Sequence, residues 1–282
     1  MPLVTTRELL DAAIADGSGL AALNVLHLET AEAIAAGAEA AGGGAVLQIS
    51  ENCVRFHGSL TPIADAATAV ARASSAPLSV HLDHAEDASL IAEALRLGFS
   101  SVMVDGARLA WEENVALTQG AARDGRAAGA VVEAEIGEIG GKDGAHAPGV
   151  RTDPEEAARF AEATGVDLLA VAVGSSHAMT ERTAAVDLEL IERISARVPV
   201  PLVLHGSSGV PDDALVAAIR SGMRKINVST QLNKVFTAAV RERLGADPGL
   251  VDSRKYLGAG RESMTGEVER LIRLFASAGS QE

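Results

Sequence analysis

Three histidines stand where apolar runs of strand character give way to loops. His84 follows PLSVHLD, His177 follows VAVGSS, and His205 follows PLVL. If these run ends converge in space, the three imidazoles would form an open zinc site with a further position for water or substrate. Glu135, near the end of VVEAEI, is a candidate fourth or alternating ligand. A single histidine at such a place is usually structural, so it is the coincidence of three that predicts a metal site.

Asp83 directly precedes the first of these histidines. A carboxylate beside a bound metal suits general acid and base chemistry, provided that it lies within hydrogen-bonding distance of the reacting proton. Neighbouring residues in a strand point to opposite faces. Asp83 and His84 can therefore serve one site only if the strand ends or twists near Asp83.

Small polar residues follow the last two apolar runs. GSSG comes directly after His205, and INVST closes the next run. Unobstructed backbone N–H groups and hydroxyls at such positions favour phosphate, although GSSG alone is typical of a turn. The candidate phosphate-binding residues are Gly206, Ser207, Ser208, Ser229 and Thr230.

The elements that must position these residues alternate regularly. Apolar runs predict strands at Leu20–Val25, Ala45–Ser50, Pro77–Asp83, Ser101–Asp105, Val131–Ile136, Leu168–Val173, Pro201–His205 and Arg224–Val228. Helical patterns lie between them at Thr30–Ala41, Ile63–Ser74, Asp87–Leu97, Glu112–Ala128, Pro154–Thr164, Asp187–Ala196, Asp212–Ser221 and Gln231–Arg243. Eight such units favour a (β/α)8 barrel, in which strand ends meet on one face. An open doubly wound sheet is second choice, because no GxGxxG follows the first strand.

Residues 1–282 are predicted to form a single domain, since no linker or low-complexity tract interrupts the pattern. Residues 246–282 lie outside the eight units and predict a helical tail, polar at 246–256 and amphipathic at 261–276. The longest loop, residues 137–152, contains five glycines. A loop of this length in a compact domain is usually functional or mobile.

Composition excludes several classes of partner. The formal charge of −14 argues against nucleic acid or an anionic membrane surface. No stretch approaches the roughly 20 apolar residues of a membrane span. Cys53 is the only cysteine, and the start MPLVTTREL lacks a signal-peptide pattern, so we expect a cytoplasmic protein.

The same motifs carry a family resemblance. HLDHAED, VMVDGA, VEAEIGEIGG, VAVGSSHAM, PLVLHGSSGV and KINVSTQLN occur in this order from about Asn24 to the tail. Together they are similar to the metal-dependent class II fructose-bisphosphate and tagatose-bisphosphate aldolases. The resemblance implies a zinc-dependent lyase that cleaves a ketose bisphosphate into dihydroxyacetone phosphate and an aldehyde. It also implies a homodimer or homotetramer, one catalytic zinc with a second or alternating position, and a monovalent cation near the phosphate.

Residue roles follow from this resemblance at matching positions. Asp83 would be the general acid/base, and His84, His177 and His205 the zinc ligands with Glu135 beside the metal. Asn227 would lie by the reacting carbons. The motifs would place phosphate contacts at Gly206, Ser207, Ser208, Ser229 and Thr230, and substrate-side positions at Asn24 and Ser50.

The sequence departs from the family pattern at three places. The loop reads GGKDG where relatives commonly have an acidic pair, so Asp143 is the expected second acid/base, with Glu138 as alternative. Gly258 stands where relatives carry an arginine for the second phosphate, and Arg261 or Arg254 would substitute. Ala178 replaces a common glycine after the second histidine.

Other readings remain open from the residues alone. A class II aldolase of another phosphorylated sugar, such as a deoxy-keto-gluconate phosphate, would use the same machinery. A Schiff-base aldolase would require a lysine within a predicted strand, and Lys225 is placed there. A metal-dependent hydrolase could use the same histidines and Asp83 on a bound water. A non-catalytic sugar-phosphate-binding barrel would keep the phosphate-binding residues but not the acid/base chemistry.

Overall fold

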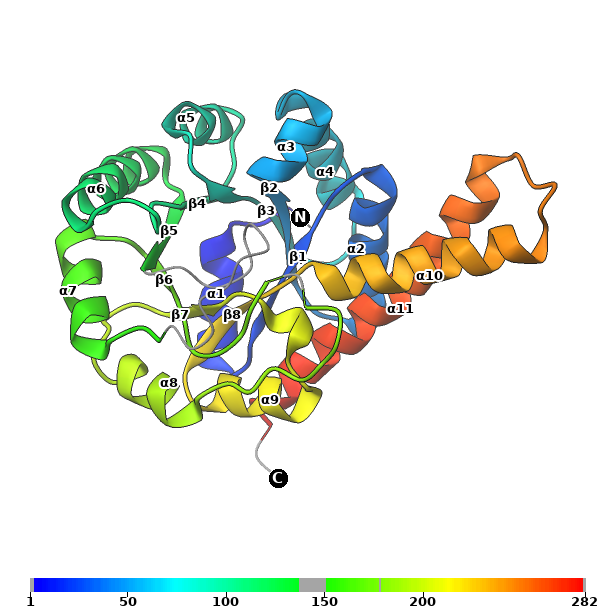
Figure 1. Ribbon diagram of the computed structural model, residues 1–282. Coiled ribbons are helices and arrows are strands. Elements are labelled where there is room, and N and C mark those ends of the chain that lie inside the picture. The colour runs from blue at the N-terminus through cyan, green and yellow to red at the C-terminus, as the bar shows by residue number, and fades with distance from the viewer. Residues whose placement is uncertain (1–2, 137–150, 178, 281–282) are drawn as a thin grey trace.

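A computed structural model describes residues 3–136, 151–177 and 179–280. Within these ranges, parallel strands close into a barrel in sequence order, β8 pairing with β1 (Figure 1). The strands are β1 Leu20–Asn24, β2 Ala45–Ser50, β3 Leu78–Ala85, β4 Ser101–Val104, β5 Val131–Ile136, β6 Leu168–Val171, β7 Leu202–Leu204 and β8 Met223–Val228. The predicted (β/α)8 fold is therefore confirmed.

Helices surround the strands, and the last two project from one side as an arm (Figure 1). They are α1 Thr6–Ala15, α2 Leu28–Ala41, α3 Glu51–His57, α4 Thr61–Ala73, α5 Ala88–Arg96, α6 Trp111–Ala128, α7 Pro154–Thr164, α8 Leu188–Ser195, α9 Asp212–Arg220, α10 Thr230–Ala246 and α11 Ser253–Ser277, with a 3-10 turn η1 at Ser207–Gly209. Neither α1 nor α3 was predicted. Helix α3 is short and buries only two of its residues, so it shows little apolar periodicity. Helix α1 buries Thr6, Leu9, Leu10 and Ala13 at helical spacing, and that spacing was a usable signal.

The tail helix begins earlier than its apolar pattern indicates. We predicted it from Arg261, but α11 starts at Ser253, where the Asp252 carboxylate accepts a hydrogen bond from the Arg254 backbone N–H. The buried side chains of α11 begin only at Gly260. Capping and local hydrogen bonds therefore start this helix, and periodicity cannot reveal them.

The amino end of the barrel is closed by α1. Its side chains Leu9, Leu10 and Ala13 pack against inward-facing strand residues such as Val46 and Met103. An apolar plug thus fills the lower barrel interior. The polar interior residues above it face the carboxyl ends of the strands, where barrel enzymes place their sites.

Strand β3 is irregular near Asp83, as a site shared by Asp83 and His84 requires. His84 has φ 49°, the only positive φ of a non-glycine residue among the described positions. The pairing of β3 with β4 shifts register between Leu82 and Ala85. Such a bulge re-aims side chains. It resolves the conflict between Asp83 and His84, which both line one cavity.

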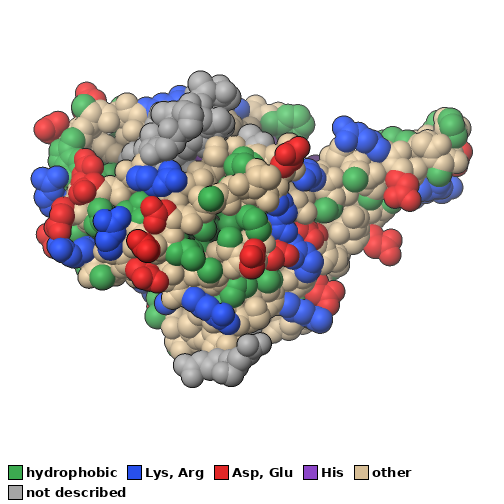
Figure 2. Space-filling model, turned by 60° about the horizontal axis from the view of Figure 1, so that its bottom comes forward, with side chains coloured by type: hydrophobic (Ala, Val, Ile, Leu, Met, Phe, Trp, Pro, Cys, Tyr) green, Lys and Arg blue, Asp and Glu red, His purple; other side chains and the backbone are tan. Residues whose placement is uncertain are grey.

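Acidic and basic side chains are interspersed on the face shown in Figure 2, so no field of one sign covers the described residues there. The negative charge is therefore distributed rather than concentrated on this face. Among the described helices, none has both the length and the apolar composition that crossing a membrane requires.

Candidate active site

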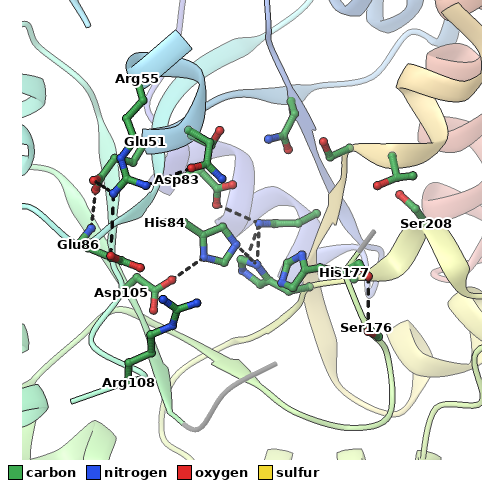
Figure 3. Close-up of a pocket in the computed structure, with 18 residues that line it drawn as sticks. Glu51, Arg55, Asp83, His84, Glu86, Asp105, Arg108, Ser176, His177 and Ser208 are labelled. Atoms are coloured by element: carbon green, nitrogen blue, oxygen red, sulfur yellow. Dashed lines mark hydrogen bonds and ion pairs between the residues drawn. The ribbon is translucent and has the colours of Figure 1, made fainter. Parts of the chain in front are cut away.

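The three predicted histidines converge at the barrel mouth (Figure 3). Ring centroids lie 4.6 Å apart for His84 and His205, 5.2 Å for His84 and His177, and 5.6 Å for His177 and His205. One nitrogen of each ring lies within 4.8 Å of the others. Residues from three strand ends, separated by up to 121 positions, therefore present nitrogens to one point.

Carboxylates hold the outward nitrogens of two of these rings. Asp105 Oδ2 lies 2.8 Å from Nδ1 of His84, and Glu133 Oε1 lies 2.8 Å from Nε2 of His205. Each carboxylate accepts an N–H, which leaves the opposite nitrogens as lone pairs. Those lone-pair atoms, Nε2 of His84 and Nδ1 of His205, lie 2.9 Å apart. Two lone pairs at this distance repel each other unless both bind one cation. This set of nitrogen donors therefore fits zinc.

A second group of donors adjoins the first. His84, Asp105 and Glu135 also offer atoms within 4.8 Å of one another. Glu135 is fully buried, with Oε2 3.9 Å from Nδ1 of His84. Glu135 therefore lies beside His84, and its alternating role stays a prediction. Asp105 was not predicted, although it ends the apolar run of VMVDGA, and that position was a usable signal.

Asp83 lines the same cavity and is 3% exposed. Its Oδ1 accepts a hydrogen bond from Nδ2 of Asn227 at 3.3 Å and lies 3.9 Å from Nε2 of His81. Burial holds the pKa of His81 well below its usual value, so this imidazole is neutral. The carboxylate of Asp83 is thus held between neutral groups beside the three histidines.

Hydroxyls and a helix amino terminus form one end of the cavity, whose volume is about 260 Å³. Ser208, Ser229 and Thr230 line it, and the last two begin α10. Gly206, with φ 66°, brings its loop against Ser176, whose backbone lies 2.5 Å from the position of any added Cβ. Only glycine permits that approach. The hydroxyls and the dipole of α10 make this end suitable for an anion, although the N–H of Gln231 already donates to Oγ of Ser208 at 3.1 Å.

Most of the other predicted substrate residues lie in the cavity, but two lie elsewhere. Asn24, Ser50 and Asn227 line it. Ser207 instead donates its hydroxyl to the backbone carbonyl of Asn227. Arg261 lies on α11, where Nη1 is 2.5 Å from Oε2 of Glu32.

The remaining predicted residues divide into one that the structure describes and three that it does not. Arg254, the alternative to Arg261, is bound to Asp252 on the arm. Asp143, Glu138 and Ala178 lie outside the described residues.

The opposite end of the cavity carries charges that sequence reasoning missed. Arg55 donates to Oε1 of Glu51 at 2.5 Å and lies 3.9 Å from Oε2 of Glu86. Arg108 lines the same end, below Asp105 in Figure 3. Glu51 and Arg55 lie on the unpredicted helix α3, so no periodic pattern marked them. The cavity therefore has one hydroxyl-rich end and one charged end.

A barrel mouth that gathers three imidazoles, a buried carboxylate and hydroxyls at a helix amino terminus fits a metal-dependent (β/α)8 enzyme. The model of the family "Fructose-bisphosphate aldolase class-II" matches residues 4–280. The chain is 37% identical to a fructose-bisphosphate aldolase of Thermus caldophilus, over 98% of this chain and 99% of that one. It is 35% identical to one of Geobacillus stearothermophilus over 99% of both chains.

A solved structure agrees with these relatives. The crystal structure of a putative fructose-1,6-bisphosphate aldolase from Coccidioides immitis superposes with a TM-score of 0.86 at 30% identity. The alignment covers 97% of this chain and 96% of that one. The chain therefore belongs to the class II fructose-bisphosphate aldolase family, a family of metal-dependent lyases.

The site disfavours the Schiff-base reading. Nζ of Lys225 is fully buried and lies 2.8 Å from Oε2 of Glu133, and it donates to Gln48 and Asn227 at 2.9 and 2.8 Å. A Schiff-base lysine must present a neutral amine to a carbonyl. Three acceptors instead hold this ammonium inside the barrel.

Proposed function

We propose that the protein is a zinc-dependent aldolase that reversibly cleaves a ketose 1,6-bisphosphate, of the fructose or tagatose type. The products would be dihydroxyacetone phosphate and glyceraldehyde 3-phosphate. The observation that carries this proposal is the convergence of His84, His177 and His205 next to the carboxylate of Asp83.

The three histidines would hold zinc, with Glu135 as an alternating ligand and Asp105 offering a second position. Zinc bound there would act as a Lewis acid that polarises the ketone and stabilises the negative charge developing on its oxygen. Asp83 would take the proton of the C4 hydroxyl during cleavage and return it during condensation. Asn227, which donates to Asp83, would hold that carboxylate in place.

The hydroxyl-rich end would bind the phosphate of the dihydroxyacetone half. Ser208, Ser229 and Thr230 offer hydroxyls there, and the α10 amino terminus adds backbone N–H groups. Ser207, whose hydroxyl is engaged, would act through its backbone only. A monovalent cation beside the phosphate would offset part of the negative charge of the phosphate.

A second acid/base must remove a carbon-bound proton in the condensation direction. We assign this step to Asp143, with Glu138 as the alternative, both in the loop after β5. Asp143 has a side chain one methylene shorter than glutamate, so loop closure would have to supply the remaining distance.

Binding of the second phosphate would depend on the oligomeric state. We propose a homodimer or homotetramer in which the α10–α11 arm forms the contact and Arg261 approaches a partner's substrate. Val251, at the turn of the arm, is 92% exposed, and Leu244 is 38% exposed. In such an assembly Arg261 would exchange its contact with Glu32 for the phosphate.

The remaining assignments rest on sequence. A single domain spanning 1–282 accounts for the uninterrupted alternation of elements, with 246–282 as its tail. A cytoplasmic location accounts for the single buried thiol of Cys53, whose pKa burial raises to about 11.

Assay of zinc-loaded protein against three substrates tests the proposal. Fructose bisphosphate, tagatose bisphosphate and a deoxy-keto-gluconate phosphate would each be offered, with dihydroxyacetone phosphate measured enzymatically. Zinc-dependent release from one bisphosphate supports the proposal. Release of inorganic phosphate without carbon–carbon cleavage would instead support a hydrolase.

A further inference from the structure

A buried ion pair lies beneath the site, one layer down inside the barrel. Glu133 on β5 and Lys225 on β8 are both fully buried, with Oε2 and Nζ 2.8 Å apart. A buried pair of this kind seldom adds net stability, because desolvation of two charges offsets their attraction. The presence of this ion pair inside the barrel therefore suggests a role other than stabilising the fold.

Glu133 connects the pair to the metal site. Its second oxygen, Oε1, accepts the Nε2–H of His205 at 2.8 Å, and this ring is also fully buried. That hydrogen bond fixes the tautomer and leaves Nδ1 as the lone pair facing His84. Lys225 holds Glu133 in place through the other oxygen, Oε2, at 2.8 Å.

Lys225 connects the pair to the substrate side. Its ammonium donates to Oδ1 of Asn227 at 2.8 Å and to Oε1 of Gln48 at 2.9 Å. Because an ammonium has no acceptor, both amides must turn their oxygens toward it. Their NH2 groups then point upward, toward Asp83 at 3.3 Å and toward Oδ1 of Asn24 at 3.0 Å.

We propose that Glu133 and Lys225 are positioning residues: Glu133 sets the metal-binding tautomer of His205, and Lys225 sets the amide orientation that holds Asp83 and Asn24. This inference rests on the proposed function and extends it to residues that touch neither metal nor substrate. One ion pair would thus orient both the metal ligand His205 and the substrate-side residues Asp83 and Asn24. Its two members would affect different measurable properties.

Four variants test this division. Glu133→Gln removes the charge that fixes His205, and Glu133→Asp keeps the charge for Lys225 but shortens the reach to His205. Lys225→Met keeps the volume without donors, and the double variant Glu133→Gln/Lys225→Met removes both charges. Ser79→Ala, a buried interior residue near the barrel base, is the matched control.

Zinc affinity of metal-free protein, measured by competition with a chromophoric chelator, is the first readout. We expect Glu133→Gln and Glu133→Asp to weaken zinc binding 10- to 100-fold, the usual effect of losing a ligand's hydrogen-bonding partner. Lys225→Met should change zinc affinity less than Glu133→Gln but lower kcat for cleavage at least tenfold with little change in KM. Ser79→Ala should leave both properties unchanged.

The double variant separates positioning from mere structural support. Urea unfolding should show a lower midpoint for each single neutralisation, because one buried charge loses its partner. The midpoint should recover in the double variant, while zinc affinity stays as low as in Glu133→Gln. Recovery of zinc affinity together with the midpoint would overturn the proposal, as would unchanged zinc affinity in both Glu133 variants.

The unfolding and zinc measurements need no substrate. A wild-type protein that binds zinc tightly but cleaves no ketose phosphate would refute the proposed function. The proposed role of Glu133 in zinc binding would then still stand. Weak zinc binding by the wild type would refute the proposed function itself.

Discussion

Polar groups occur at both ends of the barrel interior, beside the apolar plug at the base and around the cavity at the mouth, but they differ in their hydrogen-bonding partners. At the base, the hydroxyl of Thr6 lies 2.9 Å from Ser79 and 2.7 Å from Ser101, and Ser101 lies 2.8 Å from Nδ1 of His81. These groups are neutral and hydrogen-bond to one another, although Nε2 of His81 makes no hydrogen bond. At the mouth, charged carboxylates hold histidines so that lone pairs face the same point.

The difference indicates what each end does. Neutral groups that hydrogen-bond to one another and do not line the cavity at the mouth support the fold. Lone pairs and hydroxyls that face a cavity require an outside partner, here a cation and an anion. The same eight strands therefore separate stability at their amino ends from chemistry at their carboxyl ends, as is general for this fold.

His205→Ala should give the largest effect at the mouth. It removes one ligand of three and leaves the buried carboxylate of Glu133 bound to Lys225 alone. We expect loss of bound zinc and a fall in kcat/KM of about a thousandfold or more. Metal analysis of the purified variant, with a steady-state assay, checks both. Normal zinc content with near-normal rates would remove His205 from the site.

Asp83→Ala should separate acid/base chemistry from metal binding. We expect zinc content close to wild type and a fall in kcat of roughly 10²- to 10⁴-fold, the usual contribution of general acid–base catalysis. Loss of zinc in this variant would show that Asp83 supports the metal rather than the proton transfer.

Ser229→Ala should have a smaller effect, confined to the anion end. Ser229 lines the cavity at the start of α10, and loss of one hydrogen bond to a charged group costs about 1.5 kcal/mol or more. We expect KM for the ketose bisphosphate to rise about tenfold with kcat nearly retained. Ser280→Ala, at the far end of the chain, is the control. Equal KM values for the two variants would move the phosphate elsewhere.

Thr6→Val, at the base, should give the smallest effect on activity and a measurable one on stability. The valine keeps the volume but loses the hydroxyl bonded to Ser79 and Ser101. We expect the free energy of unfolding to fall by about 1 kcal/mol, with kcat/KM unchanged. Denaturant titration and the cleavage assay measure the two effects. A tenfold loss of activity would abolish the distinction between the two ends.

The strands and the three clustered histidines could be predicted from sequence because both follow from pattern. Buried parallel strands read as apolar runs, and barrel closure brings their ends together. His84, His177 and His205 needed only to stand at three such ends. The agreement of these three with the observed cluster was thus a consequence of topology.

The supporting residues could not be predicted in the same way. Glu133 lies within an apolar run and carries no local signal for a partner 72 positions away. The position of Lys225 in a predicted strand made it a candidate nucleophile. In the structure its ammonium group contacts Glu133, Gln48 and Asn227 instead. Helix α3, which brings Arg55 to the charged end, depends on the cap formed by Ser50 and on local contacts, not on periodicity. Hydrogen-bonding partners are a property of the folded chain.

Anomalous diffraction at the zinc edge, from crystals of the protein soaked in zinc, tests the shared metal position most directly. The account predicts a peak about 2.1 Å from Nε2 of His84 and Nδ1 of His205, and close to the ring of His177. A catalytically active crystal whose only anomalous peak lies away from these rings would contradict it.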